Sequence, residues 1–274
     1  MNYKQATEFL FNQLPMFQRK GKAAYKSNLD NTHKLDAYFK HPHHNFKTIH
    51  VAGTNGKGSV SHILAAIFQT AGYKTGLYTS PHLIDFRERI KVNGAMILES
   101  EVVNFVKDHS TIIKEIKPSF FEMTVAMAFD YFARQQVDIA IVETGLGGRL
   151  DSTNIIFPEL SIITNISFDH TAFLGDTLVK IATEKAGIIK AETPVVIGES
   201  QEICKDIFIE KANNLNSKII FANEIFSIPY SMQNTEGLQV FNVESKCDTN
   251  YKNLAIDLLG QYQKKNVITC LAAI

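Results

Sequence analysis

The sequence is poor in several features that mark particular classes of protein. Its three cysteines, Cys204, Cys247 and Cys270, are odd in number and widely spaced, so neither a disulfide framework nor a thiolate metal site is predicted. The 28 basic and 28 acidic residues leave no net charge, which argues against bulk nucleic-acid binding. No apolar run approaches the roughly 20 residues that span a bilayer, and the first residues lack a signal-peptide pattern. These absences favour a cytoplasmic protein that binds neither nucleic acid nor membrane.

The remaining composition is that of a globular protein. The 274 residues are 45% hydrophobic and contain no internal repeats or low-complexity segments. At about 150 residues per domain, this length predicts one large or two small domains.

Strand, turn and helix signals alternate over most of the chain after residue 46. Residues 46–52 form a β-branched run, and apolar positions recur at helical spacing over 60–71 until Gly72. Further strands are predicted at 75–79, 137–142, 160–164, 194–197 and 218–221, and further helices at 101–116, 121–132, 176–186 (capped by Asp176) and 201–214. This alternation predicts an α/β fold of the phosphate-loop type, with a mainly parallel sheet flanked by helices.

The two ends of the chain depart from this pattern. Residues 1–46 are predicted to be an extension, with a helix ending near Pro15 and a Lys-rich loop to about Asn31. Short alternating segments over about 223–258 predict a small antiparallel β appendage. An apolar helix begins at Asn266 and reaches the last residue without a stop signal.

A glycine-rich turn between the first strand and its helix carries the strongest local signal. Its backbone N–H groups and the following helix N-terminus suit a polyphosphate, and its lysine suits the outer phosphates. Val51 stands where the usual motif has its first glycine, and the hydroxyl is displaced by one residue. An ATP or GTP site is predicted at Gly53, Thr54, Asn55, Gly56, Lys57, Gly58 and Ser59.

Polar residues also follow later strands, at the edge where open α/β sheets bind ligands. Glu143 ends one strand and is a candidate metal ligand, and the glycine-rich segment to Asp151 follows it. His170 is a candidate imidazole ligand or a hydrogen-bonded surface residue. The four histidines at 41, 43, 44 and 50 lack a fixed ligand spacing and are interpreted as loop residues.

Two further features leave alternatives open. Lys185 lies on the apolar face of its predicted helix, where it either snorkels to solvent or occupies a desolvated site. The segment from Thr79 to Asn93 carries Arg87 and Arg89, which pair with an anionic substrate or belong to a basic surface loop.

Six motifs, in order and in register, resemble the folylpolyglutamate synthase/dihydrofolate synthase family of the Mur ligase superfamily. They are GTNGKGS (53–59), TSPHL (79–83), RERI-x-x-NG (87–94), ETGLGGRLDSTN (143–154), FDHTAFLG (168–175) and EKAGIIK (184–190). The displaced hydroxyl at Ser59 is the family's own variant of the phosphate loop. The resemblance implies a monomeric ligase that uses ATP and Mg²⁺ to join L-glutamate to dihydropteroate or a reduced folate through an acyl phosphate.

The resemblance also implies roles for particular residues. Lys57 would contact the phosphates of ATP, and Asn266, in a linker that departs from the family at Tyr262, would face the adenine. One Mg²⁺ would be held by Ser59 and Glu143, and a second by Ser80, Glu143 and His170, while Lys185 would hold metal as a carbamate. The catalytic set would be Lys57, Glu143, His170 and Lys185. Candidate substrate contacts are Pro81, His82, Arg89, Phe121, Thr124, Asp151 and Ser152.

Family members carry a second domain that supplies much of the glutamate site. The sequence is therefore expected to hold an ATP-binding domain over 1–260, followed over 261–274 by a linker and the start of a helix towards a glutamate-ligase domain that is missing. Residues 1–274 alone would then bind nucleotide and Mg²⁺ but be nearly inactive.

Three alternatives remain at this stage. A UDP-muramyl-peptide ligase shares the ATP site, but the SPHL and RERI segments argue against it. A regulatory GTPase requires an N-K-x-D motif, and the nearest candidate, at 165–169, lacks the lysine. A non-catalytic nucleotide-binding module is the third.

Overall fold

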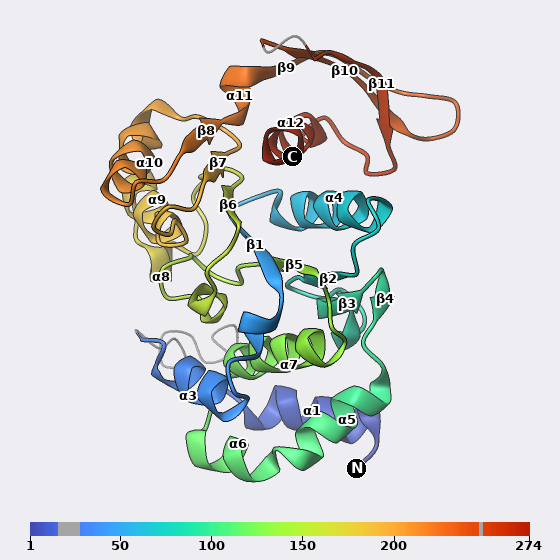
Figure 1. Cartoon of the computed structure of the whole chain (residues 1–274), viewed down its shortest axis with the longest axis vertical. Coiled ribbons are helices and arrows are strands. Elements are labelled where there is room, and N and C mark those ends of the chain that lie inside the picture. The colour runs from blue at the N-terminus through green and yellow to red at the C-terminus, as the bar shows by residue number, and fades with distance from the viewer. Residues whose placement is uncertain (16–27, 247–248) are drawn as a thin grey trace. The chain divides into compact units, whose positions relative to one another are not determined.

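The computed structural model describes residues 1–15, 28–246 and 249–274 (Figure 1). Cys247 and most of the predicted Lys-rich loop lie outside these residues. None of the helices within the described ranges is long and apolar enough to cross a membrane.

The main sheet has eight strands and confirms the predicted α/β class. In chain order they are β1 (Lys47–Ala52), β2 (Thr75–Tyr78), β3 (Ile90–Val92), β4 (Ala95–Met96), β5 (Ile139–Glu143), β6 (Leu160–Ile163), β7 (Val195–Ile197) and β8 (Ile219–Phe221). Their order in the sheet is β4-β3-β2-β5-β1-β6-β7-β8. β2 and β5 pair in parallel, as do β6, β7 and β8, whereas β3 and β4 form an antiparallel edge.

A second, three-stranded sheet confirms the predicted appendage. It consists of β9 (Phe226–Gln233), β10 (Gln239–Ser245) and β11 (Tyr251–Ile256), and β10 pairs antiparallel with both neighbours. All three strands lie within the predicted range of about 223–258.

The chain divides into two compact units. Unit 1 contains residues 1–49 and 65–157, and unit 2 contains residues 50–64 and 158–274, so β1 and α4 (Lys57–Thr70) each pass from one unit to the other.

Unit 1 is built on a core of aliphatic and aromatic side chains. Its other helices are α1 (Tyr3–Gln13), α3 (Asp30–Tyr38), α5 (Glu99–Asp108), α6 (Ser110–Ile116) and α7 (Phe120–Arg134), with short 3₁₀ turns η2 (Pro42–Asn45), η3 (Phe86–Arg89) and η4 (Ser152–Ile155). α7 begins with a capping box in which Ser119 and Glu122 satisfy each other's backbone N–H groups. It buries Met127, Phe129 and Phe132 in the core, and α1 packs on α5 (Figure 1).

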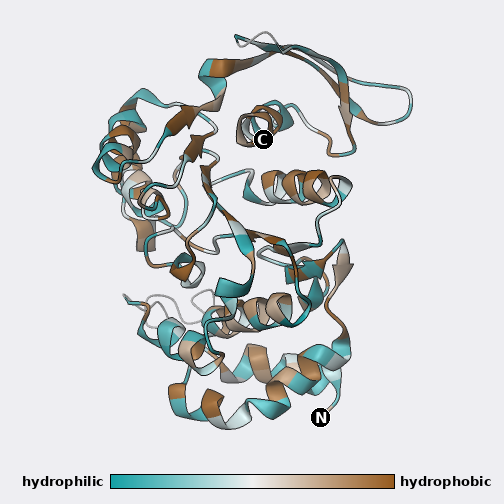
Figure 2. Ribbon diagram, viewed as in Figure 1, coloured by the Kyte–Doolittle hydropathy of each residue, from teal (hydrophilic) through white to brown (hydrophobic). Residues whose placement is uncertain are grey.

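Unit 2 carries the second half of the parallel sheet. Its helices are α8 (Thr171–Leu174), α9 (Leu178–Ala186), α10 (Glu202–Asn214), α11 (Ala222–Ile225) and α12 (Gln263–Ala273). The strands β6, β7 and β8 are hydrophobic, as their brown colour in Figure 2 shows, and Val195, Val196 and Ile197 of β7 are buried. Such continuous apolar runs are typical of parallel strands covered on both faces.

Several predicted elements differ from the structure. The helix predicted over 101–116 is two helices, because the chain leaves helical geometry at His109. Asp176 does not cap α9: the N-cap is Thr177, whose hydroxyl accepts the Lys180 N–H at 3.2 Å. The elements α3, α8, β3 and β4 were not predicted: α8, β3 and β4 have only two to four residues, and the nine residues of α3 are mostly polar, so all four carry too little periodicity.

Candidate functional site

The predicted phosphate loop connects β1 to α4 in unit 2, and α4 begins at Lys57. Two of its glycines have positive φ angles, +146° at Gly53 and +84° at Gly56. A Cβ on Gly53 would lie 1.8 Å from Thr164 Oγ1, and one on Gly56 would lie 2.2 Å from Asn266 Oδ1. Only glycine fits either position, so the sequence pattern has a steric reason.

Two lysine amines converge on this loop. Lys57 Nζ donates to the Gly53 carbonyl at 3.0 Å and to the Thr54 carbonyl at 3.2 Å. Lys185 Nζ, from α9, donates to the same Gly53 carbonyl at 2.8 Å. Lys185 is only 3% exposed, so of its two interpretations the structure supports a buried amine rather than a snorkelling one.

The segment after β6 holds the loop in place, which the sequence alone did not reveal. Thr54 Oγ1 donates to the Ser167 carbonyl and accepts the Ser167 N–H. Asn165 Oδ1 accepts the Asn55 N–H at 2.9 Å, and Thr164 Oγ1 donates to the Asn55 carbonyl at 2.6 Å. The available signal was three polar residues, Thr164, Asn165 and Ser167, among the four that follow a buried strand.

A cavity of about 560 Å³ opens beside the loop in unit 2. Asn55, Gly56 and Ser59 line it from the loop, and Tyr262 and Asn266 line it from α12 and the residue before it. Asn266 is buried, and its Nδ2 donates to Gln263 Oε1 at 2.7 Å. This volume lies in the usual range for small-molecule sites.

His170, the predicted imidazole ligand, lies on the surface of unit 2. Its side chain is 41% exposed, and its Nε2 is 3.5 Å from Asp169 Oδ2. The residue has a left-handed backbone with φ +48° and caps α8. Its metal role stays a prediction.

Glu143 is a buried carboxylate of unit 1. It ends β5, is 3% exposed, and its Oε2 accepts the Ser80 N–H at 3.2 Å. Ser80 follows β2, the parallel neighbour of β5, so adjacent strand ends bring the two predicted ligands together. A carboxylate and a hydroxyl are oxygen donors of the kind that Mg²⁺ prefers. The described residues contain no group of three or more His, Cys, Asp or Glu arranged to hold a metal.

Asp151 organises the glycine-rich segment after Glu143. Its carboxylate accepts the N–H groups of Gly145, Leu146 and Thr153 at 2.8–3.0 Å. Complete burial raises the pKa of Asp151, and these donors oppose that rise. The structure thus gives Asp151 a supporting role, and its contact with substrate stays a prediction.

Other predicted substrate residues lie near this segment in unit 1. The ring of Phe121 fills the space where a Cβ on Gly145 would stand. The Thr124 hydroxyl bonds back to the Phe120 carbonyl within α7. Ser152 is buried in the first turn of η4.

The segment from Ser80 to Arg89 is a compact loop ending in η3, with a cis Ser80–Pro81 bond. Arg89 is buried, and its Nε donates to His82 Nδ1 at 2.7 Å. Arg87 pairs with Asp85 at 2.7 Å and lies 3.6 Å from Glu99. Burial lowers the pKa of His82, and the Arg89 charge lowers it further, so His82 accepts this bond as a neutral imidazole.

The prediction that the clustered histidines are loop residues is correct for His41, but His43 and His44 lie in η2 and His50 lies in a strand. His50 is a fully buried residue of β1. His41 and His43 bond through Nδ1 to the two oxygens of Asp36, at 2.5 and 2.8 Å.

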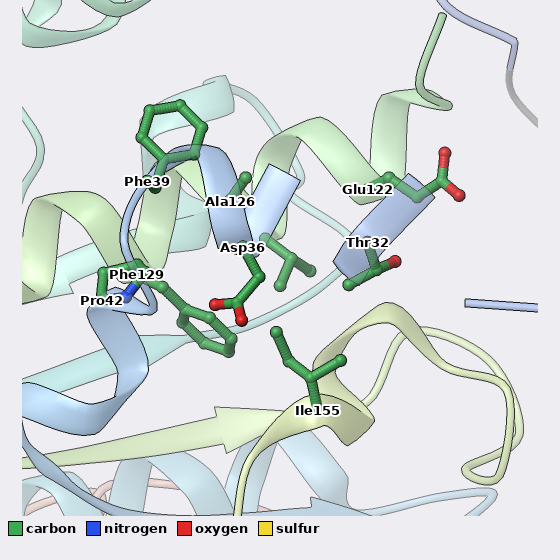
Figure 3. A pocket seen from close by; sticks show the side chains of 9 residues that line it. Thr32, Asp36, Phe39, Pro42, Glu122, Ala126, Phe129 and Ile155 are labelled. Atoms are coloured by element: carbon green, nitrogen blue, oxygen red, sulfur yellow. The ribbon is translucent and has the colours of Figure 1, made fainter. Parts of the chain in front are cut away.

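Asp36 also lines a small cavity of unit 1, with Thr32 and Ile155 (Figure 3). At about 10 Å³, the cavity has room for about one water and not for an aromatic ligand.

Comparison with known proteins agrees with this arrangement of strand, phosphate loop and helix. The sequence pattern of the Mur ligase middle domain matches residues 51–274, which is most of the chain. The chain therefore belongs to the Mur ligase family.

Its relatives within that family are folate enzymes. It is 38% identical over 266 residues to the dihydrofolate synthase/folylpolyglutamate synthase of Bacillus subtilis, covering 92% of this chain and 60% of the relative. It matches the apo form of L. casei FPGS with a TM-score of 0.90 at 31% identity, covering 99% of this chain and 66% of that one. It matches an FPGS-AMPPCP-folate complex with a TM-score of 0.89, at the same identity and coverage. These likenesses place the chain in the folylpolyglutamate synthase/dihydrofolate synthase branch, and it spans 60 to 66% of the length of these relatives.

Proposed function

We propose that this protein takes part in an ATP-dependent amide ligation that adds L-glutamate to dihydropteroate, to a reduced folate, or to both. The observation that carries the proposal is the phosphate loop Gly53–Ser59, with Lys57 and the buried Lys185 donating to one of its carbonyls. Support comes from a structural relative, 31% identical, that is described as a complex with AMPPCP and folate. Both ATP and reduced folates are cytoplasmic metabolites, so the proposal includes a cytoplasmic location.

The reaction explains why charged groups are needed. A carboxylate is a poor electrophile, so ATP first transfers its γ-phosphoryl group to the folate carboxylate and ADP leaves. The glutamate amine then attacks the acyl carbon, phosphate departs with the bonding electron pair, and the nitrogen loses a proton. The protein's part is to neutralise phosphate charge and align the reacting groups.

Unit 2 supplies the nucleotide-binding residues in this proposal. The backbone N–H groups of residues 53–59 and the first turn of α4 bind the phosphates. Lys57 exchanges its bonds to the Gly53 and Thr54 carbonyls for bonds to phosphate oxygens. Asn266, in the wall of the 560 Å³ cavity, contacts the base.

Each unit carries candidate Mg²⁺ ligands. Unit 1 carries Ser80 and Glu143, and unit 2 carries Ser59, His170 and Lys185. When bound, Mg²⁺ would neutralise charge on the phosphates. The carboxylate of Glu143 fits a hard cation, and Lys185 would fit one after its amine takes up CO₂ and becomes an anionic carbamate.

The folate is proposed to bind residues of unit 1. Pro81, His82 and Arg89 belong to the loop after β2, Phe121 and Thr124 to α7, and Asp151 and Ser152 to the start of η4. His82 is the only charged or titratable one of these that is not buried, so it is the first candidate for direct contact.

Ligand binding to the 274-residue chain tests the proposal without requiring turnover. Calorimetry with Mg²⁺ present should show ATP binding more tightly than GTP, and either dihydropteroate or tetrahydrofolate binding where a UDP-muramyl peptide does not. Preference for GTP, or binding of the muramyl peptide alone, would overturn it. The assignment of residues 1–260 to one ATP-binding domain and the monomeric state are part of the same proposal. Sedimentation velocity of the chain at several concentrations tests the monomeric state.

A further inference from the structure

The loop after β2 is folded around a single carboxylate. Glu88 accepts three successive backbone N–H groups: Leu83 at 2.8 Å on Oε2, and Ile84 and Asp85 at 2.9 and 2.7 Å on Oε1. The last of these is half of a capping box, in which the Asp85 carboxylate stands at the start of η3. One side chain thus fixes the backbone of the whole turn.

The charged form of Glu88 is the form that performs this task. Its three bonds from backbone N–H groups lower the pKa of Glu88 to about 2, although the residue is only half-buried. A carboxylate has two acceptor oxygens with about four lone-pair sites, so it can take all three donors. A glutamine would present one oxygen and turn an NH₂ group towards the remaining N–H donors.

The backbone N–H groups and the side chains of this loop point in different directions. The backbone donors point inward to Glu88, while the side chains of Leu83 and Ile84 are 90% and 94% exposed. On one side of these two residues, His82 receives the Arg89 guanidinium, which is itself buried over the Phe120 ring. The loop therefore holds the His82 imidazole and the exposed side chains of Leu83 and Ile84 in one fixed conformation.

We propose that Glu88 is the positioning residue of the acceptor-binding loop: it holds residues 82–84 in the conformation that receives the folate, through the backbone and without touching the ligand. This inference rests on the proposed function, in which that loop binds the acceptor. It makes Glu88 a determinant of acceptor affinity and not of ATP affinity.

Hydrogen exchange and ligand binding together test this role in the whole chain. In Glu88→Gln, the amides of Leu83, Ile84 and Asp85 should exchange about tenfold faster, and the dissociation constant for tetrahydrofolate or dihydropteroate should rise about tenfold. ATP binding should not change, because the phosphate loop lies in unit 2, and the melting temperature should fall only modestly, because Glu88 is half-buried. Glu88→Asp keeps the charge on a shorter arm and should fall between wild type and Glu88→Gln. Glu115→Gln, an exposed carboxylate of α6, is the matched control for charge loss.

Each other result overturns the proposal in a recognisable way. Weaker acceptor binding without faster exchange would mean that Glu88 contacts the ligand itself. Faster exchange with unchanged acceptor binding would mean that the turn is purely structural. Failure of the wild-type chain to bind either acceptor would refute the proposed function, and the exchange data would still report whether Glu88 fixes the turn.

Discussion

The amines of Lys57 and Lys185 donate to the same oxygen, the carbonyl of Gly53, at 3.0 and 2.8 Å. The two residues are far apart in sequence and come from different helices, α4 and α9. The two lysine side chains at one loop carbonyl give this part of unit 2 a positive potential that favours the binding of an anion.

Replacement of Lys57 should weaken nucleotide binding without unfolding the protein. Lys57→Ala removes a charged donor to the phosphates, so we expect ATP affinity to fall about 10- to 100-fold. Calorimetric titration with ATP measures this. Lys180→Ala, which removes an exposed amine paired with Asp176, is the control and should bind ATP like the wild type. Equal affinity of the two variants would exclude Lys57 from the phosphate site.

Lys185 should take up CO₂ if its proposed carbamate forms. Incubation with labelled bicarbonate, followed by native mass spectrometry, should show one added CO₂ in the wild type and none in Lys185→Met, which nearly keeps the volume of the buried side chain. Retention of the label in Lys185→Met would place the modification on a different lysine.

Glu143→Gln should separate the charge of this residue from its structural contact. The amide oxygen can still accept the Ser80 N–H, so the melting temperature should stay close to that of the wild type. The increase in ATP affinity on adding Mg²⁺ should fall about tenfold, because a neutral oxygen is a weaker ligand for a hard cation. Titration of ATP with and without Mg²⁺ checks this, with Glu8→Gln on α1 as control. An undiminished Mg²⁺ effect would exclude Glu143 as a ligand.

Gly53→Ala should lower the stability of unit 2 more than Gly72→Ala lowers stability, because the new Cβ of Gly72→Ala enters open space. Both Gly53 and Gly72 have positive φ angles, but only Gly53 has a neighbour, Thr164 Oγ1, in the position of a new Cβ. Backbone strain alone costs about 1–3 kcal/mol, so Gly72→Ala should lose about that much stability. Gly53→Ala should lose more, and should also lose ATP binding. Urea unfolding compares the two, and equal losses would show that the Thr164 contact relaxes freely.

The buried His50 predicts a loss of stability in acid. Burial, assisted by the charge of Lys190, lowers the pKa of His50 from 6.5 to about 3. Between these values the unfolded chain binds a proton at His50 and the folded chain does not, so stability decreases as the pH falls. The contribution of this one group between pH 7 and pH 4 is about 3 kcal/mol. His50→Gln should therefore show a shallower decline in urea unfolding free energy over that range, whereas His44→Gln, an exposed residue, should follow the wild type.

The elements with strong local patterns were predictable, and the reasons are visible in the structure. The apolar spacing over 60–71 and the stop at Gly72 correspond to α4, and the β-branched run at 137–142 corresponds to β5. Lys185 was placed correctly on an inward helix face from spacing alone. These features depend on residues a few positions apart, which is the range over which a single sequence is informative.

The features that the sequence did not predict depend on distant partners. Nothing local distinguishes the buried His50 from its exposed neighbour His44, because burial is decided by the strands and helices around β1. The bracing of Asn55 by Asn165 joins residues 110 positions apart. Asp151 and Glu88 were visible as polar residues in motifs, but their role as acceptors for loop N–H groups required the folded backbone. Site assignments made by resemblance, such as His170, stay predictions.

The contact between α12 and the phosphate loop has a consequence for the order of events during synthesis. Gln263 Nε2 lies 3.4 Å from Ser59 Oγ, a separation of 204 residues, and Cys270 contacts the Val60 carbonyl across 210 residues. Contacts of such high sequence separation are costly in chain entropy and form late. A ribosome-bound chain that has exposed residues 53–59 already has the whole motif but lacks one wall of its cavity. Tight nucleotide binding should thus begin only after residue 266 has emerged, so ATP should not stabilise shorter nascent chains.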